Sequence, residues 1–124
     1  MKKILLIEPD RVLLEVYKEV FTREGYKVKS VESSSEAILA IEDDKPDLII
    51  IELQLPAHNG IELLNELKSY DDLHECKVII NSIIPADSLG MSSAIKKAYN
   101  IVATVYKPDT SIEKLIGLAS AALE

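Results

Sequence analysis

The sequence lacks the features that would link it to a membrane, a nucleic acid or an internal disulfide. It has one cysteine, Cys76, so no disulfide can form within the chain. Residues 1–3 precede only four apolar residues, too few for a signal peptide or a membrane span. The net charge is −7, whereas nucleic-acid binding by the chain alone requires a basic face. We therefore expect a cytoplasmic protein that binds neither membranes nor nucleic acid.

The sequence also lacks the motifs of a small enzyme. The segment 8–11, Glu-Pro-Asp-Arg, stands where a glycine-rich phosphate loop would follow the first apolar run. Neither His58 nor His74 lies in a motif that links it to Cys76 as a base to a nucleophile. We therefore disfavour an enzyme and expect no catalytic activity.

The composition is that of one globular domain. The chain has 124 residues, of which 48% are apolar and 28% charged, ordinary values for a domain with a single core. We expect one domain over residues 1–122. Leu123 and Glu124 read as residues encoded by an expression vector ahead of a tag, so that the domain would come from a longer protein.

Apolar runs and spacings predict five strands, each followed by a helix. Residues 4–7 and 48–51 are continuous apolar runs, as in parallel strands buried on both faces. Further strands are predicted over 26–31, at an edge, and over 77–82 and 101–106. Helical spacing predicts helices from Asp10 to Gly25, over 61–67, through 91–98 and over 112–119. Capping boxes at Ser33/Glu36 and Thr110/Glu113 predict the starts of the second and fifth helices.

This alternation predicts an α/β fold with a parallel sheet and right-handed crossovers. Five units in a chain of this length suit a flavodoxin-like, doubly wound (βα)5 sheet with strand order 2-1-3-4-5. In that order strands 1 and 3 are neighbours. Glu8 and Glu52, which follow them, would share one crevice at the carboxyl edge of the sheet.

Five motifs in register resemble the receiver domain of bacterial two-component response regulators, the CheY-like fold, over essentially the whole chain. They are Ile-Leu-Leu-Ile-Glu at 4–8, Pro-Asp-Leu-Ile-Ile-Ile-Glu at 46–52, Leu-Pro-x-x-Asn-Gly at 55–60, Ser82, and Lys107-Pro108. The resemblance implies signal transduction by a phosphorelay. A histidine kinase passes a phosphoryl group to a residue at the position of Glu52. Residues at the positions of Ser82 and Lys107 contact the phosphoryl oxygens.

The resemblance also implies a Mg²⁺ site, and the chain departs from the family there. The phosphoacceptor position holds Glu52 in place of aspartate, which moves the carboxylate outward, and a shift of about 1 Å can cost ~10²-fold in rate. The second acidic position holds Pro9, which has no carboxylate. Glu8, Asp10 and Gln54 remain as weak candidates for an acidic or metal-binding pocket, so that Mg²⁺ binding is weakened. The switch position, often aromatic in the family, is Thr104.

These departures predict an atypical pseudo-receiver in which phosphorylation is lost or weakened. Three versions stay open. Glu52 and Lys107 form an ion pair that caps the sheet, or Glu52 paired with Lys107 imitates a phosphorylated aspartate, or Glu52 or a nearby acid still accepts phosphate with Mg²⁺. We expect a histidine kinase or another signalling protein as partner, and the resemblance implies a homodimer face on the fourth helix, the fifth strand and the fifth helix.

Overall fold

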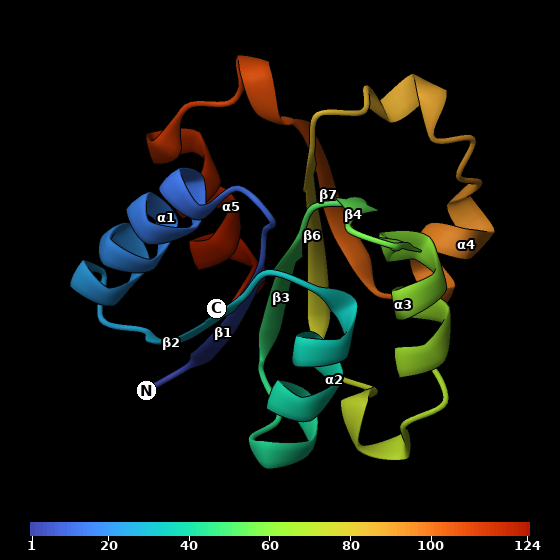
Figure 1. The fold of residues 1–124 in the computed structure, drawn as a ribbon, viewed down its shortest axis with the longest axis horizontal. Coiled ribbons are helices and arrows are strands. Elements are labelled where there is room, and N and C mark those ends of the chain that lie inside the picture. Colours follow the sequence, from blue (N-terminus) through green and yellow to red (C-terminus); the bar gives the residue numbers. More distant parts are fainter.

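Five parallel strands form the centre of the molecule (Figure 1). The computed structural model describes residues 1–124, apart from the side chain of Ala86. The strand order in the sheet is β2 (Lys27–Val31), β1 (Lys3–Ile7), β3 (Leu48–Ile51), β6 (Lys77–Ser82) and β7 (Ile101–Tyr106). This confirms the predicted order 2-1-3-4-5, because the short strands β4 (Gln54–Leu55) and β5 (His58–Asn59) lie outside this sheet. No helix in the described residues is long and apolar enough to cross a membrane.

Strands and helices alternate along the chain, as predicted. The main elements are β1 (Lys3–Ile7), α1 (Arg11–Arg23), β2 (Lys27–Val31), α2 (Ser34–Asp43), β3 (Leu48–Ile51), α3 (Gly60–Leu67), β6 (Lys77–Ser82), α4 (Ser93–Ala98), β7 (Ile101–Tyr106) and α5 (Ile112–Ala122). Short 3-10 turns occur at Asp71–Leu73, Ala86–Ser88 and Lys107–Asp109.

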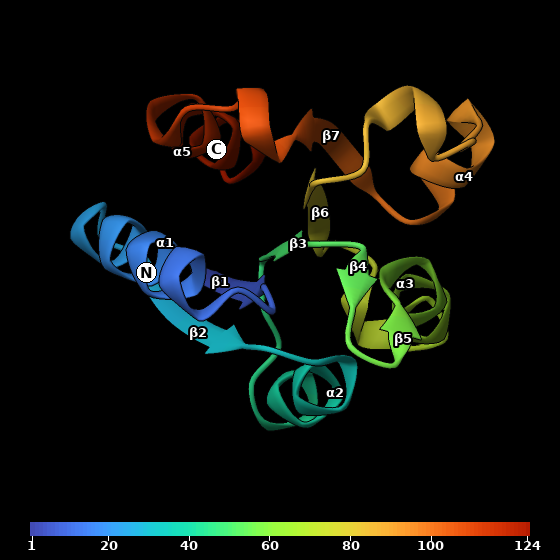
Figure 2. The ribbon, with the colours of Figure 1, turned by 45° about the horizontal axis from the view of Figure 1, so that its top comes forward.

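The helices form two layers, one on each face of the sheet. Figure 2 shows α1 and α5 on one side of the strands and α2 and α3 on the other. Successive residues of β1 serve both layers, because side chains alternate along a strand. Ile4 and Leu6 pack with Phe21 and Leu115, whereas Leu5 and Ile7 belong to the core under α2 and α3. Both faces of the central strands are therefore buried, as their unbroken apolar runs predict.

Side-chain caps fix most of the helix starts. Asp10 accepts hydrogen bonds from the backbone of Val12 and Leu13, as predicted. Ser33 caps α2 as predicted, because its hydroxyl accepts from the backbone N–H of Glu36. The Glu36 carboxylate accepts from the Ser33 hydroxyl and from the backbone N–H of Glu32, so the box closes one residue earlier than predicted. The second predicted box is wrong.

The cap of α5 is Ser111, one residue beyond the predicted Thr110. The Ser111 hydroxyl accepts from the backbone N–H of Lys114. Thr110 does not cap the helix, because its hydroxyl donates to the backbone carbonyl of Tyr106 in the preceding turn.

Helix α4 is shorter and less buried than its apolar spacing predicts. It begins after Ser92, whose side chain caps it, so Met91 lies outside it. None of its residues is buried, and Ile95 is 39% exposed. Gly90, at φ 62°, turns the chain just before Met91. The predicted stripe therefore packs loosely.

A two-stranded antiparallel ribbon between β3 and α3 was not predicted. It pairs β4 (Gln54–Leu55) with β5 (His58–Asn59). Its turn places Ala57 at φ 62°, in the left-handed region where glycine is the usual residue. Because an alanine stands there, the sequence carries little signal for the turn.

Candidate functional site

Four of the predicted site residues meet at the carboxyl edge of the sheet. Parallel pairing sets β1 beside β3 and β3 beside β6, with Ile7 opposite Ile51 and Ile51 opposite Ile80. The residues that follow these strands are therefore at one level. Glu8, Glu52, Ser82 and Lys107 lie together, and each of the first three is less than a tenth exposed.

Lys107 joins the two carboxylates. Its Nζ lies 2.8 Å from Glu52 Oε1 and 2.5 Å from Glu8 Oε1. The side chain of Lys107 is 9% exposed, and those of Glu52 and Glu8 are 2% and 5% exposed. One ammonium thus lies between two carboxylates in a place that water hardly reaches, where charge interactions are strong and an unpaired charge is costly.

Both oxygens of Glu52 are fully occupied. Oε1 accepts from Lys107 Nζ and, at 2.9 Å, from the backbone N–H of Ile83. Oε2 accepts from the Ser82 hydroxyl and, at 3.0 Å, from the backbone N–H of Gln54. A carboxylate offers about four acceptor positions. Glu52 therefore has no free lone pair for a metal ion or for attack on phosphorus without first losing one of these bonds.

The environment moves the pKa values of the three charged groups in different directions. Burial alone would raise the pKa of Glu52, but hydrogen bonds from Lys107, Ser82 and two backbone amides outweigh it, and the pKa is lowered. Burial would lower the pKa of Lys107, but its bonds to Glu52 and Glu8 raise it. Glu8 differs, since burial outweighs its bonds to Lys107 and to the Asp10 amide, and its pKa is raised.

The remaining predicted residues lie outside this cluster. The carboxylate of Asp10 caps α1. Gln54 contributes its backbone N–H, and its side chain is exposed. Thr104 lies opposite Ile80 in the sheet, and its buried hydroxyl has no hydrogen-bond partner among the described atoms. Pro9 supplies no carboxylate, as its identity requires.

Sequence reasoning missed a buried polar pair beside the cluster. Asn81 Nδ2 donates to the Tyr17 hydroxyl at 3.2 Å, linking β6 to α1. Both residues border the same narrow space as Glu8 and Glu52. The sequence offered one signal, the amide side chain of Asn81 directly after the apolar run of β6. A buried polar group needs a hydrogen-bond partner, so this position indicated that a polar side chain would lie nearby.

The donor set does not fit a Mg²⁺ ion in this arrangement. Mg²⁺ requires several oxygen ligands in near-octahedral geometry. The two carboxylates that face the crevice are both paired with Lys107. Within the described residues, no three His, Cys, Asp or Glu side chains lie close enough to hold a metal ion.

A comparison with protein-family models identifies the fold family. The model of the response regulator receiver domain matches residues 4–115. This chain belongs to that family. The receiver domain is a module of two-component signalling, and receiver domains partner with histidine kinases.

Relatives of known role match parts of this receiver domain. The transcriptional regulatory protein CpxR of Klebsiella pneumoniae is 39% identical over 80 residues, 64% of this chain and 33% of CpxR. KdpE of Staphylococcus aureus is 29% identical and covers 80% of this chain and 45% of KdpE. This chain therefore spans less than half the length of either regulator. The chemotaxis protein CheY of Thermotoga maritima is 22% identical and covers 92% of this chain and 94% of CheY.

Solved structures agree in fold. The chemotaxis response regulator CheY4 of Vibrio cholerae superposes with a TM-score of 0.85 at 16% identity, covering 98% of both chains. TrrA of Thermotoga maritima, solved in complex with Mg(2+)-BeF, superposes at 0.79 with 23% identity and covers 98% of this chain and 99% of TrrA. At these identities the likeness supports the CheY-like fold alone.

Proposed function

We propose that this receiver domain is a pseudo-receiver: it signals through protein–protein contacts, and the ordinary phosphorylation cycle is lost or weakened. The observation that carries the proposal is the occupancy of Glu52. Its four acceptor positions are filled by Lys107, Ser82 and two backbone amides. A nucleophile in phosphoryl transfer needs a free lone pair held in line with the phosphorus atom.

The same contacts favour the locked version of the proposal over a simple ion pair. The family resemblance assigns the serine and lysine positions to the oxygens of the phosphoryl group. Here Ser82 and Lys107 both bond to the carboxylate of Glu52 itself. The carboxylate of the longer glutamate side chain thus makes the contacts that the phosphoryl group of a phosphorylated aspartate would make. We propose that these contacts hold the domain in one conformational state.

Metal binding is weakened for the same reason. The ammonium of Lys107 supplies the positive charge between Glu8 and Glu52 that a metal ion would otherwise supply. We propose that the domain works in the cytoplasm, has no catalytic activity of its own, and interacts with a histidine kinase or another signalling protein. A homodimer through α4, β7 and α5 stays a prediction.

Phosphorylation by a small phosphodonor tests this function. The chain is incubated with acetyl phosphate and Mg²⁺, and its intact mass is compared with that of the double variant Pro9→Asp, Glu52→Asp. We expect no mass change in the wild type and the gain of one phosphoryl group in the double variant. A Mg²⁺-dependent gain of one phosphoryl group in the wild type would return the protein to the conventional phosphorelay, with Glu52 or a nearby acid as acceptor.

A further inference from the structure

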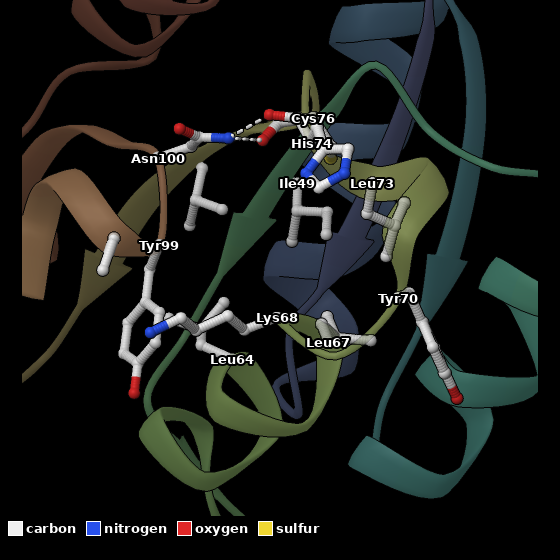
Figure 3. Close-up of a pocket in the computed structure, with 12 residues that line it drawn as sticks. Ile49, Leu64, Leu67, Lys68, Tyr70, Leu73, His74, Cys76, Tyr99 and Asn100 are labelled. Carbon is white, nitrogen blue, oxygen red and sulfur yellow. Dashed lines mark hydrogen bonds between the residues drawn. The ribbon is translucent and has the colours of Figure 1, made fainter.

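A second hollow, which shares no lining residue with the carboxylate cluster, lies between α3 and the end of α4. Its volume is about 280 Å³, just below the roughly 300–1,000 Å³ of typical small-molecule pockets. Figure 3 shows the side chains that line it. A hollow of this size suits a single ring with a short substituent rather than a peptide segment.

The floor of the hollow is apolar. Ile49 of β3 and Val78 of β6 come from the sheet, and Leu64 and Leu67 come from α3. All four are 5% exposed or less. Cys76 also lines it, and burial raises the pKa of its thiol to about 12, so the thiol is neutral. The floor therefore favours an uncharged, apolar group.

The rim of the hollow carries one positive charge, the ammonium of Lys68. No aspartate or glutamate is among the described lining residues. This contrasts with the chain as a whole, which has a net charge of −7. Asp47 acts on Cys76 through its charge, but its carboxylate accepts the backbone N–H of Lys3 and is not part of the lining.

Lys68 is positioned at the opening without an acidic partner. Its ammonium lies over the ring of Tyr99, 5.6 Å from the centroid, and so reaches from α3 toward the end of α4 (Figure 3). The Tyr99 hydroxyl donates back to Asn65 of α3 at 3.1 Å. No ion pair of Lys68 occurs among the described side chains. Its ammonium has three donors and is available to an anion.

The other end of the hollow is held by hydrogen bonds from one side chain to the backbone. Asn100, at φ 57°, donates through Nδ2 to the carbonyls of His74 at 2.6 Å and Cys76 at 3.2 Å. These bonds tie the end of α4 to the start of β6. The loosely packed helix α4 does not fill the hollow with its own side chains. The hydrogen bonds of Asn100 fix the position of the chain at this end of the hollow.

We propose that this hollow binds a small organic anion, with an apolar ring against the floor and a carboxylate at Lys68. The apolar floor selects the ring. The ammonium of Lys68, at a rim whose described lining has no carboxylate, selects the acid. The proposal concerns a site separate from Glu52 and does not depend on the state of the carboxylate cluster.

Amide shifts in two-dimensional NMR test the site with defined probes. The ¹⁵N-labelled chain is titrated with benzoate, phenylacetate and indole-3-acetate. The matched controls are phenylacetamide, which has the same shape without the charge, and 2-phenylethylamine, which has the opposite charge. We expect saturable shifts with at least one of the acids, confined to amides around Lys68, Cys76 and Asn100, and weaker binding of both controls.

Variants show whether the charge and the hollow are both used. Lys68→Gln changes an exposed residue and should weaken binding about fivefold, the size of a well-formed exposed ion pair. Ala98→Phe adds a ring to a lining residue and should abolish the shifts, while Lys114→Gln on α5 should leave them unchanged. The dispersion of each spectrum reports whether the variant is folded.

Four results would overturn the proposal. They are the absence of saturable shifts with all three acids, shifts centred elsewhere, equal binding of phenylacetamide and phenylacetate, or undiminished binding by Lys68→Gln. The phosphodonor experiment reads the mass of the chain at a different site, so failure of one proposal is distinguishable from failure of the other.

Discussion

Lys107 Nζ lies 2.8 Å from Glu52 Oε1, in a site where both side chains are less than a tenth exposed. The same ammonium also contacts Glu8. The pairing explains why two carboxylates are tolerated at one edge of the sheet, since burial of an uncompensated charge costs several kcal/mol. It also predicts how the domain responds when each partner is removed.

Removal of the ammonium should destabilise the domain strongly. Lys107→Met leaves Glu8 and Glu52 side by side without a cation, and we expect a loss of about 3–5 kcal/mol in the free energy of unfolding at neutral pH. Urea denaturation measures it. Lys114→Gln, at an exposed position of α5, should change stability by no more than about 0.5 kcal/mol. A small effect of Lys107→Met would show that the pair adds little to stability.

The two glutamates should respond to pH in opposite ways. The pKa of Glu8 is raised above its ordinary value of 4.5, so its stabilising contribution is complete below pH 4.5 and is lost as the pH rises through its folded pKa. The pKa of Glu52 is lowered, so its contribution is present above pH 4.5 and is lost as the pH falls through its folded pKa.

Urea denaturation across a pH series tests this asymmetry. Glu8→Gln should raise the free energy of unfolding at pH 7 relative to the wild type, with the gain shrinking toward pH 4.5. Glu52→Gln should lower it at pH 7, with the loss shrinking below pH 4.5. Parallel curves for wild type and variants would contradict the assigned pKa directions.

Asp10 should behave as a helix cap. Asp10→Ala removes the acceptor for the backbone of Val12 and Leu13 and should cost about 1 kcal/mol of stability. Asp10→Asn keeps an acceptor oxygen and should cost much less. Thermal denaturation of both variants measures this. Equal loss in the two variants would mean that the charge of Asp10, rather than its cap, matters.

Two glycines should differ sharply on substitution by alanine. A Cβ at Gly60 would lie 2.8 Å from the backbone Cα of Leu53, and such overpacking typically costs about 1–3 kcal/mol. A Cβ at Gly117, within α5, would meet nothing within 4 Å, and alanine there should stabilise the helix by up to about 1 kcal/mol. Urea denaturation of Gly60→Ala and Gly117→Ala measures both, and changes of the same sign would contradict the close approach.

The convergence of the site residues could be predicted, because parallel strands bring their carboxyl ends to one edge. Glu8 and Glu52 follow strands that pair in register. The sequence could not predict that all four acceptor positions of the Glu52 carboxylate are occupied by hydrogen bonds. It depends on the backbone amides of Gln54 and Ile83, whose directions are set by loop conformation and not by residue type.

Two errors in the fold have separate physical causes, a choice between neighbouring caps and the loose packing of a helix. Thr110 and Ser111 can both cap α5, and the bond of Thr110 to Tyr106 decides for Ser111. The apolar spacing at α4 is genuine, yet the helix has no buried residue. Apolar spacing predicts that a helix forms and not how tightly it packs.

Titration with Mg²⁺ shows whether Lys107 takes the place of a metal ion between Glu8 and Glu52 and whether the occupied Glu52 carboxylate excludes that ion. Amide shifts of Glu52, Gln54 and Ser82 are followed by NMR as Mg²⁺ is raised into the millimolar range. We predict no saturable shift in the wild type and a saturable shift in Pro9→Asp, Glu52→Asp. Saturable shifts at these amides in the wild type would contradict the account.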